Sequence, residues 1–197
     1  MKISKVLGFA ALDSRGKPTV AVQVVREDGQ IFTAHTPSGA STGKFEAHEL
    51  RDSDGRGVEN AVTNVNTKIA PVVIGREADP YTIDVILSDL DPTENHQNLG
   101  ANATLATSLA VTKAAGGDNL ARYFDKSDSL LIPMPMVNIL SGGAHAAKTM
   151  DIQDVLVIPN GATSFKEAIT RLLLGLYDSL IEPSITNKEF PPNIFLR

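Results

Sequence analysis

Near the start of the chain, apolar residues recur at every second position. In residues 20–24 valine alternates with Ala21 and Gln23, which is the period of a strand with one buried face. Asp28-Gly29 follows, and then Ile31-Phe32-Thr33-Ala34, so the pattern is that of two strands joined by a tight turn. The apolar residues 6–12 predict a further strand before them. Together these segments predict an antiparallel meander of three strands.

Three later segments predict helices: two repeat their apolar residues every three or four positions, the period of a helix with one buried stripe, and the third is rich in alanine and small residues that allow close packing. The first begins at Val58 and can end at Gly75, the second begins at Pro80, and the third, residues 101–115, is stopped by Gly116-Gly117. Their predicted buried positions are Ala61, Val62, Val65, Ile69, Val72 and Val73 in the first helix and Ile83, Ile86, Leu87 and Leu90 in the second. Three strands followed by helices indicate an α+β domain.

The composition changes after Lys126-Ser127-Asp128-Ser129. Residues 130–140 predict a short, largely apolar strand entered through Pro133 and Pro135, and residues 151–158 predict another strand. Ser164-Phe165-Lys166-Glu167 is a capping box that opens a helix, whose apolar stripe is Phe165, Ala168, Ile169, Leu172, Leu173, Leu176 and Leu180. We therefore divide the chain into a first domain, residues 1–130, and a second region, residues 131–197.

Composition argues against several classes of function. The 197 residues are 42% hydrophobic, enough for a real core, and a formal net charge of -5 without a cluster of Lys and Arg argues against a nucleic-acid partner. No apolar run approaches the roughly 20 residues that span a bilayer, and residues 6–12 are at the short limit for a secretory signal. The absence of cysteine fits a reducing compartment, so we expect a cytoplasmic protein.

Small and hydroxyl-bearing residues crowd the segment Pro37-Ser38-Gly39-Ala40-Ser41-Thr42-Gly43. Its two glycines permit backbone angles closed to other residues and can act as hinges, while its serines and threonine offer compact oxygen ligands. Such a segment suits a mobile lid that closes over a phosphorylated ligand. A solvated serine-rich loop has the same composition, and these residues alone leave both interpretations open.

Several further motifs follow along the chain, and a family resemblance rests on them. They are Leu12-Asp13-Ser14-Arg15-Gly16-Lys17-Pro18-Thr19-Val20, the segment 37–43, Glu46-Ala47-His48-Glu49-Leu50-Arg51-Asp52, Thr93-Glu94-Asn95 with Leu99-Gly100-Ala101-Asn102-Ala103, and Asn138-Ile139-Leu140-Ser141-Gly142-Gly143-Ala144-His145-Ala146. In their order and spacing these motifs resemble the enolase family, over about residues 3–181. The number of separate motifs argues against a chance match.

The resemblance implies an α+β amino-terminal domain joined to the start of an α/β barrel. It also implies the reaction of phosphopyruvate hydratase, a carbon–oxygen lyase of glycolysis that interconverts 2-phosphoglycerate and phosphoenolpyruvate with Mg²⁺. In this superfamily a basic side chain removes a proton next to a carboxylate, and magnesium stabilises the ene-diolate that results. The family takes its acidic metal ligands, its lysine base and its glutamate acid from later barrel strands.

Five residues of this chain match family positions with known roles, which the resemblance implies here. Ser41 matches the lid serine that joins a magnesium ion, and Ala40 beside it is implied to contact substrate. His145 matches a catalytic histidine that hydrogen-bonds the phosphate or the leaving group, and Gln153 matches a substrate-contacting glutamine. Asp154 stands where the family has a catalytic glutamate; its side chain is one methylene shorter and reaches about an ångström less far, enough to damage a positioned hydrogen bond.

The number of residues decides what we expect of the barrel. A complete eight-stranded α/β barrel takes ~200 residues, whereas 67 residues follow Leu130 in this chain of 197. We therefore expect an incomplete barrel without most of the family's catalytic residues, and Asn187 occupies the place of the general acid if Pro192-Asn193-Ile194 is the anchor. An open sheet edge and an uncovered apolar stripe favour association, so we expect a homo-oligomer or a hetero-oligomer with an enolase-like chain.

Three interpretations of function follow. The chain is part of an active enolase whose remaining barrel is supplied elsewhere, a non-catalytic enolase-like binding or dimerisation module, or a degenerate gene product. On its own we expect it to be inactive. The three histidines other than His145 have no ligand-like spacing and are expected to be structural, and Asp91 and Glu94 are expected to cap turns or helices rather than to bind metal.

Overall fold

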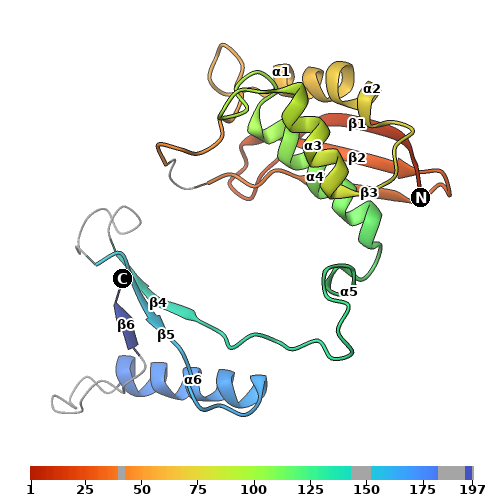
Figure 1. The fold of residues 1–197 in the computed structure, drawn as a ribbon. Helices are drawn as coiled ribbons and strands as arrows, with labels where there is room; N and C mark the ends of the chain where they lie inside the picture. The colour runs from red at the N-terminus through yellow and green to blue at the C-terminus, as the bar shows by residue number, and fades with distance from the viewer. Residues whose placement is uncertain (40–42, 143–151, 182–193, 197) are drawn as a thin grey trace. The chain divides into compact units, whose positions relative to one another are not determined.

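The computed structural model of the chain describes residues 1–39, 43–142, 152–181 and 194–196 (Figure 1). They divide into two compact units, Met1–Asp128 and Ser129–Arg197. Each unit contains a three-stranded sheet, in the orders β1-β2-β3 and β4-β5-β6. In the described part of the chain no helix is long and apolar enough to cross a membrane.

The first sheet is formed by β1 (Ile3–Leu12), β2 (Pro18–Arg26) and β3 (Ile31–His35), all antiparallel. The alternation in residues 20–24 places Val20, Val22 and Val24 in the core with no exposed surface. Gly29, with φ of 81°, forms the turn between β2 and β3 and donates its N–H to the Arg26 carbonyl. The predicted meander is confirmed.

The first predicted helix is present but is not uniform. It consists of α1 (Glu59–Asn64), a π-helical turn η1 (Val65–Ile69) and α2 (Ala70–Val73). The wider turn comes just before Pro71, which has no N–H to donate and whose ring crowds the preceding turn of an α-helix. The period of apolar residues detects the helix, but it does not reveal one extra residue in a turn.

The remaining helices of the first unit are α3 (Pro80–Leu90), α4 (Ala101–Gly116) and the short α5 (Leu120–Phe124). α4 packs against β2 and β3, and α1 and η1 pack against β1, which places helices over the sheet in Figure 1. In α3 the predicted stripe is confirmed, since Ile83 and Leu87 are buried and Ile86 and Leu90 are partly buried against the same core.

The second unit contains β4 (Val137–Ser141), β5 (Asp154–Val157), β6 (Ile194–Leu196) and α6 (Phe165–Ile181). Its strands are antiparallel, and the described residues form no closed barrel. β4 begins later than the predicted residues 130–140, because Pro133 and Pro135 cannot donate hydrogen bonds to a sheet. β5 is also shorter than predicted, and β6 was not predicted.

Helix α6 confirms the predicted helix start. The Glu167 N–H donates to Ser164 Oγ at 3.2 Å, which is the first half of a capping box. In the second half of a capping box the Glu167 carboxylate would accept from the Ser164 N–H. Here it accepts instead from the N–H and the hydroxyl of Thr163, one residue earlier, both at 2.8 Å. Of the predicted stripe, Ala168 and Leu172 are buried, whereas Phe165 and Leu173 are exposed by 48% and 62%; the side chains of Leu176 and Leu180 lie outside the described ones.

Candidate functional site

The predicted site residues Gln153 and Asp154 lie where strands β4 and β5 pair at one end. Asp154 pairs with Ser141 in the antiparallel register, and the Gly142 N–H donates to the Gln153 carbonyl at 2.6 Å. The hairpin therefore holds the beginning of the Gly-Gly-Ala-His motif next to Gln153 and Asp154. His145 lies outside the described residues.

A small polar cluster fixes the Asp154 carboxylate. The Asn138 side-chain amide donates to Asp154 Oδ1 at 2.7 Å and to Ser141 Oγ at 2.7 Å. The Ser141 hydroxyl also lies 3.4 Å from Asp154 Oδ1. Asp154 is half-buried and Gln153 is exposed, so a carboxylate with a fixed orientation stands beside an amide that is open to solvent. Such a pair can bind hydroxyl or other polar groups of a small ligand.

Sequence reasoning missed Asn138 and Ser141 as partners of Asp154. The available signal was that both are polar in an otherwise apolar strand. Their relation to Asp154 depends on the pairing register, which slips by one residue between Asn138 and Leu140. A bulge of this kind re-aims side chains and is not visible in the order of residues.

The predicted lid segment is described up to Gly39 and from Gly43, so Ala40 and Ser41 lie outside the described residues. The residues before them contact the turn between β1 and β2. Arg15 Nη1 donates to the Gly39 carbonyl at 3.2 Å, and the backbone N–H groups of Arg15 and Lys17 donate to Asp13 Oδ1 at 2.8 Å. The turn thus fixes the entry to the segment.

Asp13 and Ser38 form a second contact at this entry. The Ser38 hydroxyl, and after it the Lys17 backbone N–H, lower the pKa of the Asp13 carboxyl to about 2. Ser38 Oγ and Asp13 Oδ2 are both buried, yet neither has a partner of full hydrogen-bond geometry in the part of the chain that the structure describes. We therefore assign their interaction to the electrostatic attraction between a hydroxyl dipole and an ionised carboxylate rather than to a well-formed hydrogen bond.

The residues just before the segment are held by a buried polar chain. Thr19 Oγ1 donates to the Thr36 carbonyl at 2.7 Å, and Thr36 Oγ1 donates to the Asn102 carbonyl at 2.6 Å. The Asn102 side chain, which has no exposed surface, accepts from the Leu50 N–H and donates to the Leu50 carbonyl. These bonds connect the first, third and fourth resemblance motifs through Thr36, which immediately precedes the second, and give them a structural reason to occur together.

Asp91 acts as a turn cap, as predicted. Its carboxylate is 1% exposed and accepts from the Thr93 hydroxyl at 2.5 Å and from the Leu99 and Asn98 N–H groups at 2.7 and 2.9 Å. Burial raises the pKa of Asp91, but these hydrogen bonds outweigh it, and the pKa lies below its usual value. Among the described residues, no group of three or more His, Cys, Asp or Glu is placed to hold a metal ion.

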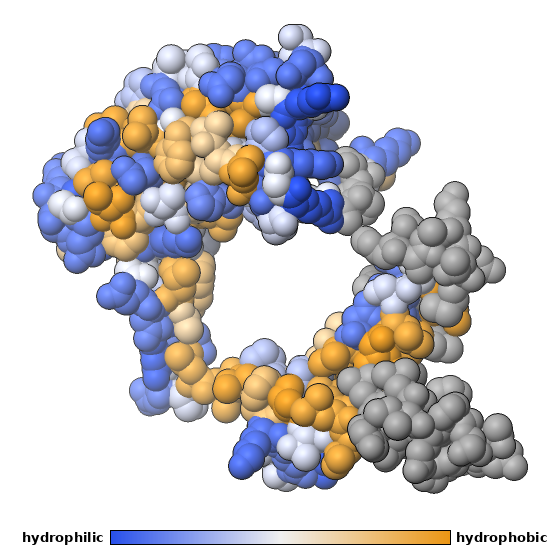
Figure 2. All heavy atoms as spheres, turned by 180° about the vertical axis from the view of Figure 1, so that it is seen from behind, coloured by the Kyte–Doolittle hydropathy of each residue, from blue (hydrophilic) through white to orange (hydrophobic). Residues whose placement is uncertain are grey.

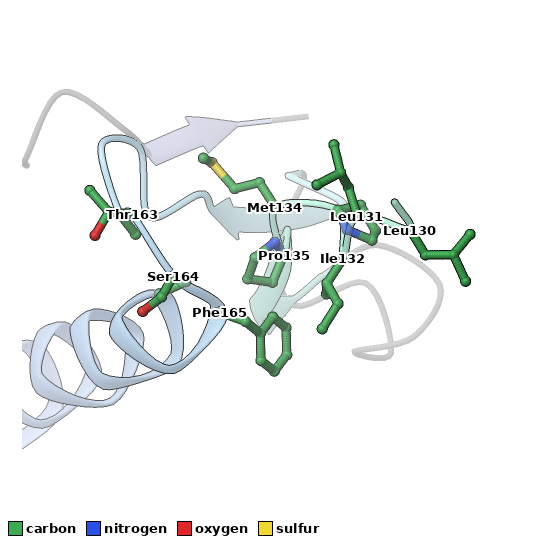
Figure 3. A pocket seen from close by; sticks show the side chains of 11 residues that line it. Leu130, Leu131, Ile132, Met134, Pro135, Thr163, Ser164 and Phe165 are labelled. Carbon is green, nitrogen blue, oxygen red and sulfur yellow. The ribbon is translucent and has the colours of Figure 1, made fainter. Parts of the chain in front are cut away.

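The second unit also has an apolar pocket of about 340 Å³. Figure 3 shows side chains from residues 130–135 facing the start of α6 across it. No titratable side chain lines this pocket, and neither Gln153 nor Asp154 is part of it. Figure 2 shows hydrophobic residues at the surface of the same unit, and Leu131 is 86% exposed. We interpret the pocket as an unfilled packing surface.

Comparison with known proteins covers both units. The family "Enolase, N-terminal domain" matches residues 3–125, and the family "Enolase, C-terminal TIM barrel domain" matches residues 129–189. An enolase of Corynebacterium kroppenstedtii is 50% identical in a match 177 residues long that covers 86% of this chain and 41% of that protein. The chain thus spans less than half the length of this curated relative. These matches agree with the sequence motifs, with the antiparallel sheet and its helices, and with the partial barrel. The chain belongs to the enolase family.

Proposed function

We propose that this chain serves the enolase reaction, the reversible dehydration of 2-phosphoglycerate to phosphoenolpyruvate, as part of a complete barrel. The observation that carries the proposal is the β4–β5 hairpin. In it the Gly142 N–H donates a hydrogen bond to the Gln153 carbonyl, and the Asn138 side-chain amide donates one to the Asp154 carboxylate. The start of the Gly-Gly-Ala-His motif thereby lies beside Gln153 and Asp154, which match family site positions, at one end of the hairpin. The curated relative carries the name enolase.

In this proposal the chain's own residues bind and orient the substrate. Gln153 and Asp154 offer an amide and a carboxylate to its polar groups, and His145 hydrogen-bonds the phosphate or the leaving oxygen. The family match assigns Ala40 a substrate contact and Ser41 a place beside a magnesium ion, in the segment whose Gly39 accepts a hydrogen bond from Arg15. Binding groups of this type contribute by holding the reacting atoms in the productive geometry.

Magnesium is the cofactor that family membership suggests. When bound, it supplies charge stabilisation for the ene-diolate. The acidic donors of the described residues do not cluster into such a site, so they do not fit magnesium by themselves. We propose that the main acidic ligands, the lysine base and the glutamate acid come from later barrel strands, on a complementing chain or a longer form of this one.

Complementation tests the proposal. The purified chain is mixed with a polypeptide carrying the remaining barrel strands of the Corynebacterium kroppenstedtii relative, and phosphoenolpyruvate formation from 2-phosphoglycerate and Mg²⁺ is followed by ultraviolet absorbance. We expect turnover in the mixture and not with either part alone. His145→Ala should abolish it, whereas His35→Ala, at an exposed position on β3, should not. A complex that forms but remains inactive would count against the proposal.

A second candidate is a non-catalytic pairing module. The observation that favours it is one face of β1, where Leu7 and Phe9 are exposed by 39% and 36%. Apolar side chains exposed along one strand suit contact with another protein surface. In the same mixing experiment, a stable complex whose activity is unaffected by His145→Ala would support this candidate instead of a catalytic role.

A further inference from the structure

The turn between β5 and α6 contains the pair Asn160-Gly161, the one Asn-Gly sequence in the chain. The Ala162 N–H donates to the Pro159 carbonyl at 3.2 Å, and Gly161 has φ of 81°, so residues 159–162 form a tight turn that needs glycine. Both Asn160 and Gly161 are exposed. Neither residue is assigned a role in the enolase reaction proposed above.

An asparagine followed by glycine is chemically labile, because glycine has no Cβ to hinder its own backbone nitrogen. We propose that Asn160 is a site of spontaneous deamidation. The Gly161 nitrogen bonds to Asn160 Cγ and gives up its proton, while the bond from Cγ to the side-chain nitrogen breaks and that nitrogen leaves as ammonia. Water then opens the resulting five-membered imide at either carbonyl, which yields aspartate or isoaspartate.

Two other turns place glycine after an acidic residue, and the structure shows why they resist the same chemistry. The Gly29 N–H donates to the Arg26 carbonyl at 3.0 Å, and the Gly55 N–H donates to the Asp52 carbonyl at 2.8 Å. In the described part of the chain, the Gly161 N–H donates no hydrogen bond. The nucleophilic nitrogen is therefore held in the two Asp-Gly turns and is free in the Asn-Gly turn.

The side-chain carbonyl group that this nitrogen would attack is also less reactive in the two Asp-Gly turns than in the Asn-Gly turn. A hydrogen bond from Arg26 lowers the pKa of Asp28, and backbone N–H groups, first that of Gly57, lower the pKa of Asp54. Both carboxyl groups are therefore ionised at neutral pH, and a carboxylate is a poor acceptor for a nucleophile. The amide of Asn160 is neutral and keeps its leaving group at every pH of interest.

Deamidation changes the surroundings of α6. It adds a negative charge next to Arg171, whose Nη1 donates to the Asn160 carbonyl at 3.3 Å and whose Nη2 pairs with Glu167 at 2.6 Å. Isoaspartate also inserts the former Cβ into the main chain, just before the Ser164 cap of the helix. The isoaspartate product therefore lengthens the connection between β5 and α6, whereas the aspartate product changes only its charge.

Peptide mapping of the aged protein tests the inference. Trypsin cleaves after Lys148 and Lys166, and the peptide between them contains Asn160 as its one asparagine. The folded chain and a synthetic peptide of residues 149–166 are incubated in separate samples at the same mildly alkaline pH. Deamidation is measured in each sample by mass and by isoaspartyl methyltransferase labelling. We expect the folded chain to react within about tenfold of the peptide rate, the range of a segment at the low end of local stability.

If the folded chain reacts more than about tenfold more slowly than the peptide, the proposal is overturned, because the turn then protects the amide. Asn160→Gln should remove the new mass and the isoaspartate label, since glutamine would have to form a six-membered ring. Asn138, which is followed by the β-branched Ile139, should stay intact in the same digest. Modification that persists in the Asn160→Gln variant would place the reaction elsewhere and also overturn the assignment.

Discussion

Asp91 shows how much one buried side chain contributes in the first unit. Asp91→Ala removes the acceptor for the Asn98 and Leu99 N–H groups and leaves them unsatisfied. Hydrogen bonds to charged groups contribute about 1.5–3 kcal/mol, so we expect a loss of about 3 kcal/mol in the free energy of unfolding, measured by chemical denaturation. Asp89→Ala, at an exposed position in the last turn of α3, two residues before Asp91, should change it little; equal effects would contradict this assignment.

The pH dependence of that difference follows from the lowered pKa of Asp91. Its stabilisation is fully present above the ordinary pKa of 3.8 and is lost as the pH falls through the lower folded-state pKa. The stability difference between wild type and Asp91→Ala should therefore shrink in acid. A difference that stays constant from neutral pH to below 3.8 would contradict the hydrogen-bonded carboxylate.

Asp13 allows a more direct measurement at the start of the predicted lid segment. Because the Ser38 hydroxyl is the largest cause of its low pKa of about 2, Ser38→Ala should raise that pKa toward 3.8. The carboxyl carbon shift of Asp13, followed by NMR against pH, reports the change. Ser53→Ala, at an exposed loop position, serves as the control. An unchanged Asp13 titration in Ser38→Ala would mean that the two side chains do not interact.

At the scale of elements, Asn66 connects the π-helical turn to the edge strand β1. Its side chain accepts from the Gly8 N–H at 2.8 Å and donates to the Gly8 carbonyl at 3.0 Å, as a neighbouring strand would. Asn66→Ala should cost about 1–3 kcal/mol of unfolding free energy and expose the edge to association. Asn60→Ala on the exposed side of α1 should be nearly neutral in denaturation and light scattering.

The close approach of the same π-helical turn explains why position 8 is glycine. A Cβ at position 8 would lie 2.7 Å from Val65 Cβ, closer than two side chains can pack. Overpacking of this kind costs about 1–3 kcal/mol. Gly8→Ala should therefore destabilise the first unit in thermal denaturation, whereas Gly16→Ala, with open space around its Cβ but φ of 72°, should act through backbone strain alone.

For the whole molecule, the position of the core predicts which part folds alone. The buried hydrophobic cluster lies between Ile3 and Ala114, within the first unit. A polypeptide of residues 1–128 should therefore unfold in one cooperative transition, with dispersed NMR signals. Residues 129–197, which expose Leu131 and Ile132 by 86% and 70%, should bind a hydrophobic dye when separated. Non-cooperative unfolding of the first fragment would contradict this division.

The elements of this chain differ in how well the sequence predicted them. The alternation around Val22 and the helical period around Ile83 predicted β2 and α3, because burial of one face follows directly from residue spacing. The π-helical turn and the start of β4 depended on Pro71 and Pro135, whose effect on the backbone the apolar pattern hides. Strand β6 depends on pairing with a partner far away in sequence.

The sequence by itself determined the enolase family, the meander with its helices and the residues that match family site positions. Its local periods specify which face each element buries, and its motifs specify ancestry. Only the tertiary structure decided that Asn138 orients Asp154, that Asn66 completes the edge of β1 at Gly8, and that Asp13 and Arg15 contact Ser38 and Gly39 in the predicted lid segment. These contacts join residues far apart in the chain, and their geometry depends on strand register and helix packing, which no local pattern encodes.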